Sequence, residues 1–216
     1  MDKYIGIFSE ITLYFSIFYP ILYIRGFVAN NKAFKIFTIY LIAIAIVQFS
    51  MRYHNLVLES SSNLHLFVYY FVSQFVLLSL FYKELLSYKW IYIVTIIVLV
   101  FIVYQYIANP EMYNRYNPIG SSITQIIIVV YAILYFYKSL AEKKQFQFVN
   151  IGIFFYLLSS VLIFASGNLV FISNYTESIS NQLANINKVL FLFFQILIII
   201  EWWKNYSVKE NNKNLE

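Results

Sequence analysis

The chain alternates long apolar stretches with short polar breaks. A helix that crosses the hydrocarbon core of a bilayer needs roughly 20 mostly apolar residues, with a range of about 17 to 25. The pattern predicts seven such helices, over Tyr4–Ile24, Phe34–Met51, Leu64–Tyr82, Trp90–Ala108, Ser121–Tyr137, Phe148–Ile172 and Leu183–Trp203. The expected fold is therefore an all-α integral membrane protein, a bundle of about seven transmembrane helices.

The basic residues in the breaks predict how this bundle is oriented. With the N-terminus outside, the inner loops and the tail hold Arg25, Lys32, Lys35, Lys83, Lys89, Lys138, Lys143, Lys144, Lys204, Lys209 and Lys213. The outer side then holds Lys3, Arg52, Arg115 and Lys188. Because Lys and Arg accumulate in cytoplasmic loops, we expect the N-terminus outside and the C-terminus in the cytoplasm. Residues 1–204 form the transmembrane domain, and residues 205–216 form a short polar tail whose composition is typical of disorder.

The composition supports a membrane location and narrows the chemistry. Charged residues make up 12% of the chain, against about 25% in a soluble domain, too few to cover a surface that faces water. The absence of cysteine excludes disulfides and thiolate metal ligands. The net charge of +5 lies at helix ends, so we expect no direct nucleic-acid partner. The 21 Tyr and 22 Phe are interpreted as the bias of an AT-rich genome, and the expected location is the plasma (inner) membrane of a bacterium.

Polar side chains inside the predicted helices are the candidates for function. A charged residue at the centre of a membrane helix costs roughly 2.5–3.5 kcal/mol, so its presence needs a reason. Most such residues fall in the outer half of the membrane, and they predict an outward-facing vestibule that binds a ligand, formed by Glu10, Gln48, Arg52, Asn168, Asn185 and Lys188. The alternative is that these side chains snorkel to the surface or form a clamping ion pair, with Glu10 as the expected partner of Lys188.

Two further sites follow from residue type and position. His54, Glu59 and His65 flank one outer loop, and two histidines with a carboxylate can hold a metal; the alternative is that both histidines simply occupy helix ends. Lys143 and Lys144 lie in an inner loop, where they would contact a cytoplasmic protein partner or anionic lipid. The alternative is that this pair only determines topology.

Three classes of function fit these expectations. The first is a non-enzymatic sensor or regulatory accessory protein of a signalling or defence system, in which the vestibule acts on a cytoplasmic partner. The second is a small transporter or an oligomeric channel subunit, which needs a polar route near the midplane and finds only Gln74 and Gln195 in the inner half. The third is a membrane-embedded lipid enzyme, for which converging titratable groups are needed. No catalytic residue and no cofactor is predicted, and the expected partners are the lipid bilayer, a cytoplasmic protein and further copies of the chain.

Overall fold

The computed structural model describes residues 2–56, 64–114, 117–141, 144–172 and 177–207. Within these ranges the chain forms α1 (Asp2–Arg25), α2 (Lys32–Leu56), α3 (Leu64–Leu86), α4 (Trp90–Ala108), the short 3-10 helix η1 (Pro110–Asn114), α5 (Pro118–Ala141), α6 (Gln147–Ile172) and α7 (Glu177–Asn205), and no strand. Among the described residues, five segments are long and apolar enough to cross a membrane: Lys32–His54, His65–Leu86, Trp90–Ala108, Pro118–Ala141 and Asn185–Asn205. The expected all-α fold is thus confirmed, and the five apolar segments are compatible with a membrane protein. Seven crossings and their orientation stay predictions.

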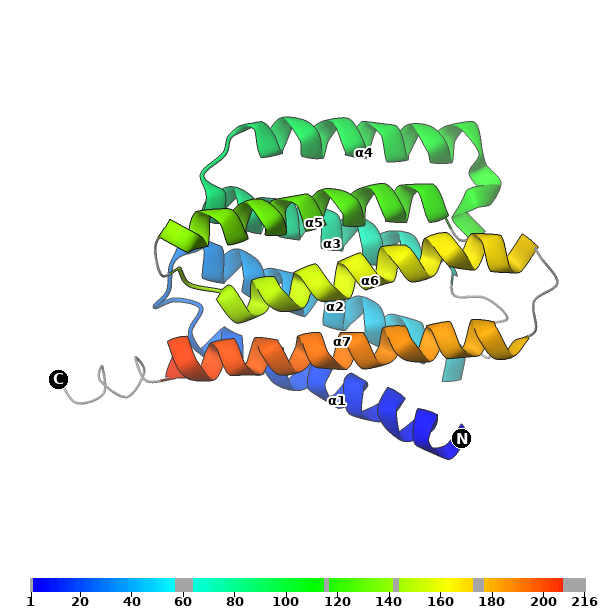
Figure 1. The fold of residues 1–216 in the computed structure, drawn as a ribbon, viewed down its shortest axis with the longest axis horizontal. Helices are drawn as coiled ribbons and strands as arrows, with labels where there is room; N and C mark the ends of the chain where they lie inside the picture. The colour runs from blue at the N-terminus through cyan, green and yellow to red at the C-terminus, as the bar shows by residue number, and fades with distance from the viewer. Residues whose placement is uncertain (1, 57–63, 115–116, 142–143, 173–176, 208–216) are drawn as a thin grey trace.

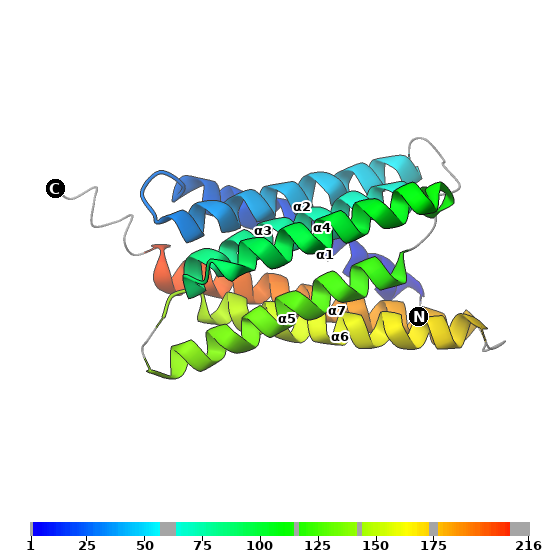
Figure 2. The same ribbon diagram turned by 90° about the horizontal axis from the view of Figure 1, so that it is seen from above.

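Successive helices run in alternating directions along a common axis (Figures 1 and 2). One end of the bundle holds the connections α1–α2, α3–α4 and α5–α6 and the end of α7; we call it the basic end. Its described basic residues are Arg25, Lys32, Lys35, Lys83, Lys89, Lys138, Lys144 and Lys204. The opposite end, which holds the start of α1, is called the N-terminal end.

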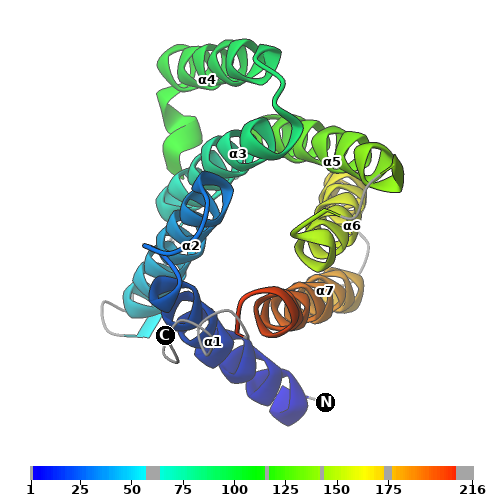
Figure 3. The ribbon, with the colours of Figure 1, turned by 90° about the vertical axis from the view of Figure 1, so that its left-hand side faces the viewer.

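Six helices close into a ring, seen end-on in Figure 3, in the order α1, α2, α3, α5, α6, α7 and back to α1. Helix α4 lies outside this ring against α3. Its buried residues are Ile91, Thr95, Val98 and Ile102, while Ile93, Ile97 and Val100 are more than 60% exposed. A helix that is apolar on every face needs an apolar environment around it, so the exposed faces of α4 are suited to lipid.

Capping asparagines start two helices, α2 and α5, before the apolar stretches that predicted them. The Asn117 side chain accepts a hydrogen bond from the Gly120 N–H at 2.8 Å, and Pro118 occupies the first helical position, which favours proline. Helix α5 consequently begins three residues before the predicted start at Ser121. Asn31 likewise accepts from the Phe34 N–H at 3.0 Å near the start of α2. The length of the apolar stretches therefore predicted where the helices lie, and the caps at Asn31 and Asn117 determined where α2 and α5 begin.

Aromatic side chains fill the interior of the ring at the basic end. The cluster, which we call the aromatic plug, comprises Tyr23, Phe34, Phe37, Phe81, Phe146 and Tyr206, all buried. Ring centroids lie 4.6 Å apart for Phe34 and Tyr206 and 5.1 Å apart for Phe81 and Phe146, within the range of favourable aromatic pairs. Burial raises the pKa of Tyr206 well above its usual value, so its hydroxyl stays neutral. These residues form a specific core, which the compositional interpretation of Tyr and Phe did not foresee.

Candidate functional site

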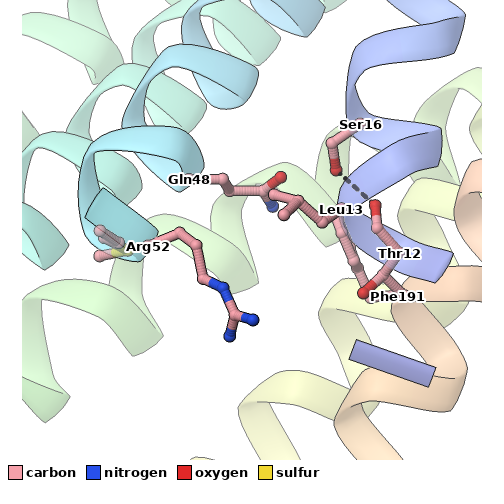
Figure 4. Close-up of a pocket in the computed structure, with 7 residues that line it drawn as sticks. Thr12, Leu13, Ser16, Gln48, Arg52 and Phe191 are labelled. Carbon is pink, nitrogen blue, oxygen red and sulfur yellow. Dashed lines mark hydrogen bonds between the residues drawn. The ribbon is translucent and has the colours of Figure 1, made fainter. Parts of the chain in front are cut away.

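A cavity of about 260 Å³, which we call the lateral cavity, lies between α1, α2 and α7 toward the N-terminal end. It is lined by Thr12, Leu13, Ser16, Gln48, Met51, Arg52 and Phe191. Figure 4 shows the Arg52 side chain extending from α2 into the space that faces α1 and α7, with Gln48 one turn earlier on the same helix. The i, i+4 spacing of these two residues places them on one face of α2, so both meet the same cavity.

A second cavity of about 240 Å³, the axial cavity, is lined by residues from all six helices of the ring. It shares Thr12, Gln48, Met51 and Phe191 with the lateral cavity, and the two therefore adjoin. Its further lining residues are Phe67, Tyr70, Gln125, Tyr156, Ser160, Asn187 and Lys188. The cavity pair thus combines two cations with amides, hydroxyls and apolar walls.

The charge in this cavity pair is uncompensated among the side chains that the structure describes. Arg52 and Lys188 are half-buried, and no carboxylate appears among the described lining residues. The ion pairs of the described residues, Lys32–Glu84 at 3.0 Å and Lys83–Glu84 at 2.8 Å, both lie at the basic end. Since a guanidinium binds carboxylates and phosphates with paired hydrogen bonds, the arrangement suits an anion.

Buried tyrosines and an amide continue from the axial cavity into the ring. The hydroxyls of Tyr70 and Tyr156 lie 3.3 Å apart, and Gln74 Nε2 donates to the Tyr40 hydroxyl at 3.5 Å. All four side chains are at least nine-tenths buried. Buried polar groups of this kind are stable only when they are hydrogen-bonded, so these contacts give the interior a polar layer below the cavities. This layer was not predicted from the sequence, because the many tyrosines were interpreted as a bias of the genome. Gln74, a polar residue in the middle of an apolar segment, does indicate how deep in the bundle the layer lies.

The wall of the lateral cavity on α1 is tied to α7. Gln195 Nε2 donates to the Thr12 carbonyl at 3.0 Å and to Ser16 Oγ at 2.9 Å, while Ser16 Oγ donates to the Thr12 carbonyl at 2.7 Å. Pro20 has no N–H and so cannot bond to the Ser16 carbonyl. The cross-link from α7 holds α1 at the turn where its own hydrogen-bond ladder is interrupted.

The structure brings together some of the predicted vestibule residues and separates others. Gln48, Arg52 and Lys188 line the cavity pair. Glu10 is exposed on α1 and Asn185 is half-buried on α7, and neither is among the described lining residues; the Asn168 side chain lies outside the described part of the chain. Helices α1 and α7 are in contact as expected, but among the described ion pairs there is none between Glu10 and Lys188.

The predicted metal site is described only in part. The rings of His54 and His65 meet edge to face with centroids 5.2 Å apart, and the Tyr113 ring lies 6.2 Å from that of His65. Glu59 lies outside the described residues. Across the described chain, no group of three His, Cys, Asp or Glu side chains is placed to hold a metal ion.

A fully buried carboxylate, Glu201, lies at the basic end and was missed from the sequence. It accepts hydrogen bonds from the backbone N–H groups of Phe146 at 2.7 Å and Phe148 at 2.9 Å, and from Asn205 Nδ2 at 2.6 Å. The positive end of the α6 dipole favours a negative charge at this place. The sequence did contain a signal for this residue. A single carboxylate in an apolar helix is costly to bury, so its presence predicts hydrogen-bond partners.

The predicted cytoplasmic contact lies beside this carboxylate. Lys144 is half-buried two residues before Phe146, and Lys143 lies outside the described residues. Phe146 adopts a φ of 63°, a left-handed conformation that is costly for a residue with a side chain. Glu201 therefore fixes the backbone at Phe146 and Phe148, where the connection from α5 enters α6.

No family model, no curated protein and no solved structure matches the chain. The geometry and charge of the cavity pair are therefore the basis on which a function is assigned.

Proposed function

We propose that this chain is an inner-membrane sensor or regulatory accessory protein that binds a small anion in an outward-facing cavity and acts on a cytoplasmic partner. One observation carries the proposal: Arg52 and Lys188 line two adjoining cavities whose described walls contain no carboxylate. The charged residues among the described walls are both cations. An anionic ligand would therefore bind favourably, because it supplies the missing counter-charge.

The charge at the two ends supports this orientation. The basic end collects the described Lys and Arg residues of three connections and of α7, and such ends remain cytoplasmic. The cavities lie toward the opposite end, which would then face outward. A fluorescent protein fused after Glu216 is expected to be bright, and alkaline phosphatase fused at the same position is expected to be inactive. The reverse result would place the cavities on the cytoplasmic side and defeat the sensor proposal.

Anion binding is tested by thermal unfolding of the purified protein in a zwitterionic detergent. Inorganic phosphate and acetate are the probes. A ligand at 100 times its Kd stabilises the folded state by about 2.7 kcal/mol, so at least one anion should raise Tm in a concentration-dependent way. Arg52→Gln and Lys188→Met should weaken this effect, whereas Lys89→Met, at an exposed lysine of the basic end, should retain it. Equal stabilisation of all three variants would assign the anion effect to bulk salt.

The alternative is a small transporter or channel subunit. The tyrosine and glutamine layer below the axial cavity favours it, because transport needs polar groups near the midplane. The aromatic plug and the buried Glu201 favour a sensor, since they fill the ring between that layer and the basic end. Proteoliposomes loaded with buffer distinguish the two: accumulation of radiolabelled phosphate or acetate that Arg52→Gln abolishes would replace the sensor by a transporter.

The basic α5–α6 loop is the proposed contact with the partner. Replacing Lys143 and Lys144 by glutamate should impair the cellular response while membrane insertion and anion-induced stabilisation remain as in the parent protein. If the response is unchanged, or only abundance falls, the pair serves topology alone.

A further inference from the structure

An apolar groove runs along the outer surface between α1 and α2, directly beside the lateral cavity. Its volume is about 390 Å³, and its lining includes Ile17, Pro20, Ile21, Ala45, Ile46 and Phe49. Ile21 is 49% exposed and Ile46 is 60% exposed, so the groove opens toward the surroundings of the bundle rather than into the ring. It therefore presents an apolar channel on a surface suited to lipid.

The groove and the lateral cavity occupy consecutive turns of the same two helices. Leu13 of the cavity and Ile17 of the groove are four residues apart on α1, and Phe49 of the groove precedes Arg52 of the cavity by three residues on α2. Residues three or four apart lie on one face of a helix. Arg52 thus stands at the end of the groove that lies toward the N-terminal end of the bundle.

The course of α1 explains why the groove and the cavity exist. Pro20 lies inside the helix and removes one backbone hydrogen bond, which bends or loosens a helix at that point. Figures 1 and 3 show α1 leaving the ring toward its N-terminus. Separation of α1 from α2 in this direction opens the space that Arg52 enters.

We propose that the lateral cavity and the groove form one site for an anionic lipid of the bilayer, with its headgroup on Arg52 and one acyl chain in the α1–α2 groove. The proposal rests on the proposed function and names the class of ligand for the same cavity. The guanidinium of Arg52 supplies paired hydrogen-bond donors for a phosphate, the Gln48 amide supplies an uncharged donor, and the groove supplies the apolar wall. A polar cavity that lies one helical turn from an outward-opening apolar groove on the same two helices fits an amphiphile better than a freely soluble anion.

A second groove offers a matched control. It lies between α5 and α6, has a volume of about 450 Å³, and is lined by Ile133, Phe136, Tyr137, Ser139, Leu140, Gln147 and Ile151. It is as apolar as the first groove and has no charged residue among its described lining residues. Lipid that binds non-specifically should occupy both grooves equally. An anionic lipid that binds Arg52 should occupy the α1–α2 groove more than the α5–α6 groove.

The test uses the full chain in phosphatidylcholine nanodiscs that contain a trace of phosphatidylglycerol with a photoactivatable acyl chain. After irradiation, peptide mapping should place adducts in the α1–α2 groove in excess over the α5–α6 groove. Arg52→Gln should reduce the α1–α2 adducts about tenfold, as expected for loss of a charge-assisted hydrogen bond, and leave the α5–α6 adducts unchanged. Ala45→Phe, which fills the groove, should reduce the same adducts, whereas Ser139→Phe in the control groove should not.

The outcomes separate this inference from the proposed function. Equal α1–α2 labelling by a photoactivatable phosphatidylcholine, or labelling that Arg52→Gln does not change, would overturn the lipid site. If phosphate or acetate then still stabilises the protein through Arg52, the cavity binds a soluble anion and the proposed function survives. If neither lipid nor soluble anion depends on Arg52, both proposals fail. Circular dichroism melts of each variant verify that a loss of labelling is not a loss of fold.

Discussion

At the basic end of the bundle, buried charge is joined to helix termini, whereas at the N-terminal end charge faces cavities. Glu201 caps the start of α6, and Lys138 Nζ donates to the carbonyls of Leu85 and Leu86 at 3.1 Å and 3.0 Å, at the end of α3. Arg52 and Lys188 line open space instead. Polar groups that are satisfied inside the protein stabilise it, whereas polar groups held ready for a ligand, the role we propose for Arg52 and Lys188, give up stability for binding.

The connections at the basic end are also bound to one another. Asn31 Nδ2 donates to Gln145 Oε1 at 3.0 Å, which joins the α1–α2 loop to the α5–α6 loop, and the Tyr135 hydroxyl donates to the Gln145 carbonyl. Glu84 pairs with Lys32 from α2 and with its neighbour Lys83. Each of these ion pairs contributes little by itself, because water near the surface screens the attraction between the charges. Together with the aromatic plug, these contacts make the basic end the closed end of the ring.

The largest effect is expected at Glu201. Glu201→Ala leaves the N–H groups of Phe146 and Phe148 without their acceptor, and a buried donor that loses its partner costs about 1–3 kcal/mol. The free energy of unfolding should fall by roughly 3 kcal/mol, and Glu201→Gln, which keeps one oxygen, should lose about half as much. Thermal unfolding in detergent measures both. The control is Glu10→Gln, an exposed acid at the other end; equal losses at the two ends would remove the distinction between them.

Close packing of α6 on α7 gives the next effect. A Cβ on Gly152 would lie 2.4 Å from Cδ2 of the buried Phe194 ring, which also stacks on Tyr156 with centroids 5.8 Å apart. Because a well-packed interior resists added volume, Gly152→Ala should cost about 1–3 kcal/mol. The smaller side chain of Phe194→Leu should recover part of the loss in a double-mutant cycle. Strictly additive losses would mean that the two residues do not meet.

A smaller effect of opposite sign is expected at the α3–α4 turn. Ser87 has a φ of 63° and its N–H donates to the Lys83 carbonyl at 2.9 Å, the geometry in which glycine commonly ends a helix. Ser87→Gly should raise the free energy of unfolding by about 0.5–1 kcal/mol, because glycine adopts this conformation without strain. Ser87→Val should lower it. Ser139→Gly, inside α5, is the matched control and should destabilise by about 0.5 kcal/mol.

The smallest change in the free energy of unfolding is expected at Lys188. A variant of this residue tests most directly whether charge at the N-terminal end is unpaired, in contrast to the basic end. Since no described carboxylate pairs with this lysine, Lys188→Met should change the free energy of unfolding by less than about 0.5 kcal/mol. Glu10→Gln should be equally mild, and the double variant should be additive. A loss of about 3–5 kcal/mol in Lys188→Met that Glu10→Gln relieves would instead reveal a buried ion pair and make the two ends alike.

The sequence predicted the helices well because membrane insertion depends on local apolar length. The interval Trp90–Ala108 agrees with α4 at both ends. The remaining helices differ mainly where polar residues continue a helix beyond its apolar stretch, as at the end of α2, which runs to Leu56, and at the start of α7, which begins at Glu177. For the site, residue type and depth identified Gln48, Arg52 and Lys188, which line the cavities. The same reasoning offered Glu10 as a partner of Lys188. This pair is not among the described ion pairs and stays a prediction, because depth along a helix does not specify the direction in which a side chain points.

The sequence by itself determined the helical class, the presence of helices long and apolar enough to cross a membrane, and the accumulation of Lys and Arg at one end, since each depends on the content of a short segment. Only the tertiary structure decided that α4 lies outside the ring, that tyrosines form a polar layer inside the ring, and that Glu201 caps α6 through the N–H of Phe146, 55 residues earlier in the chain. These features depend on which helix faces meet. In a chain whose helices are apolar on nearly every side, periodicity alone does not specify those faces, and packing between distant segments selects them.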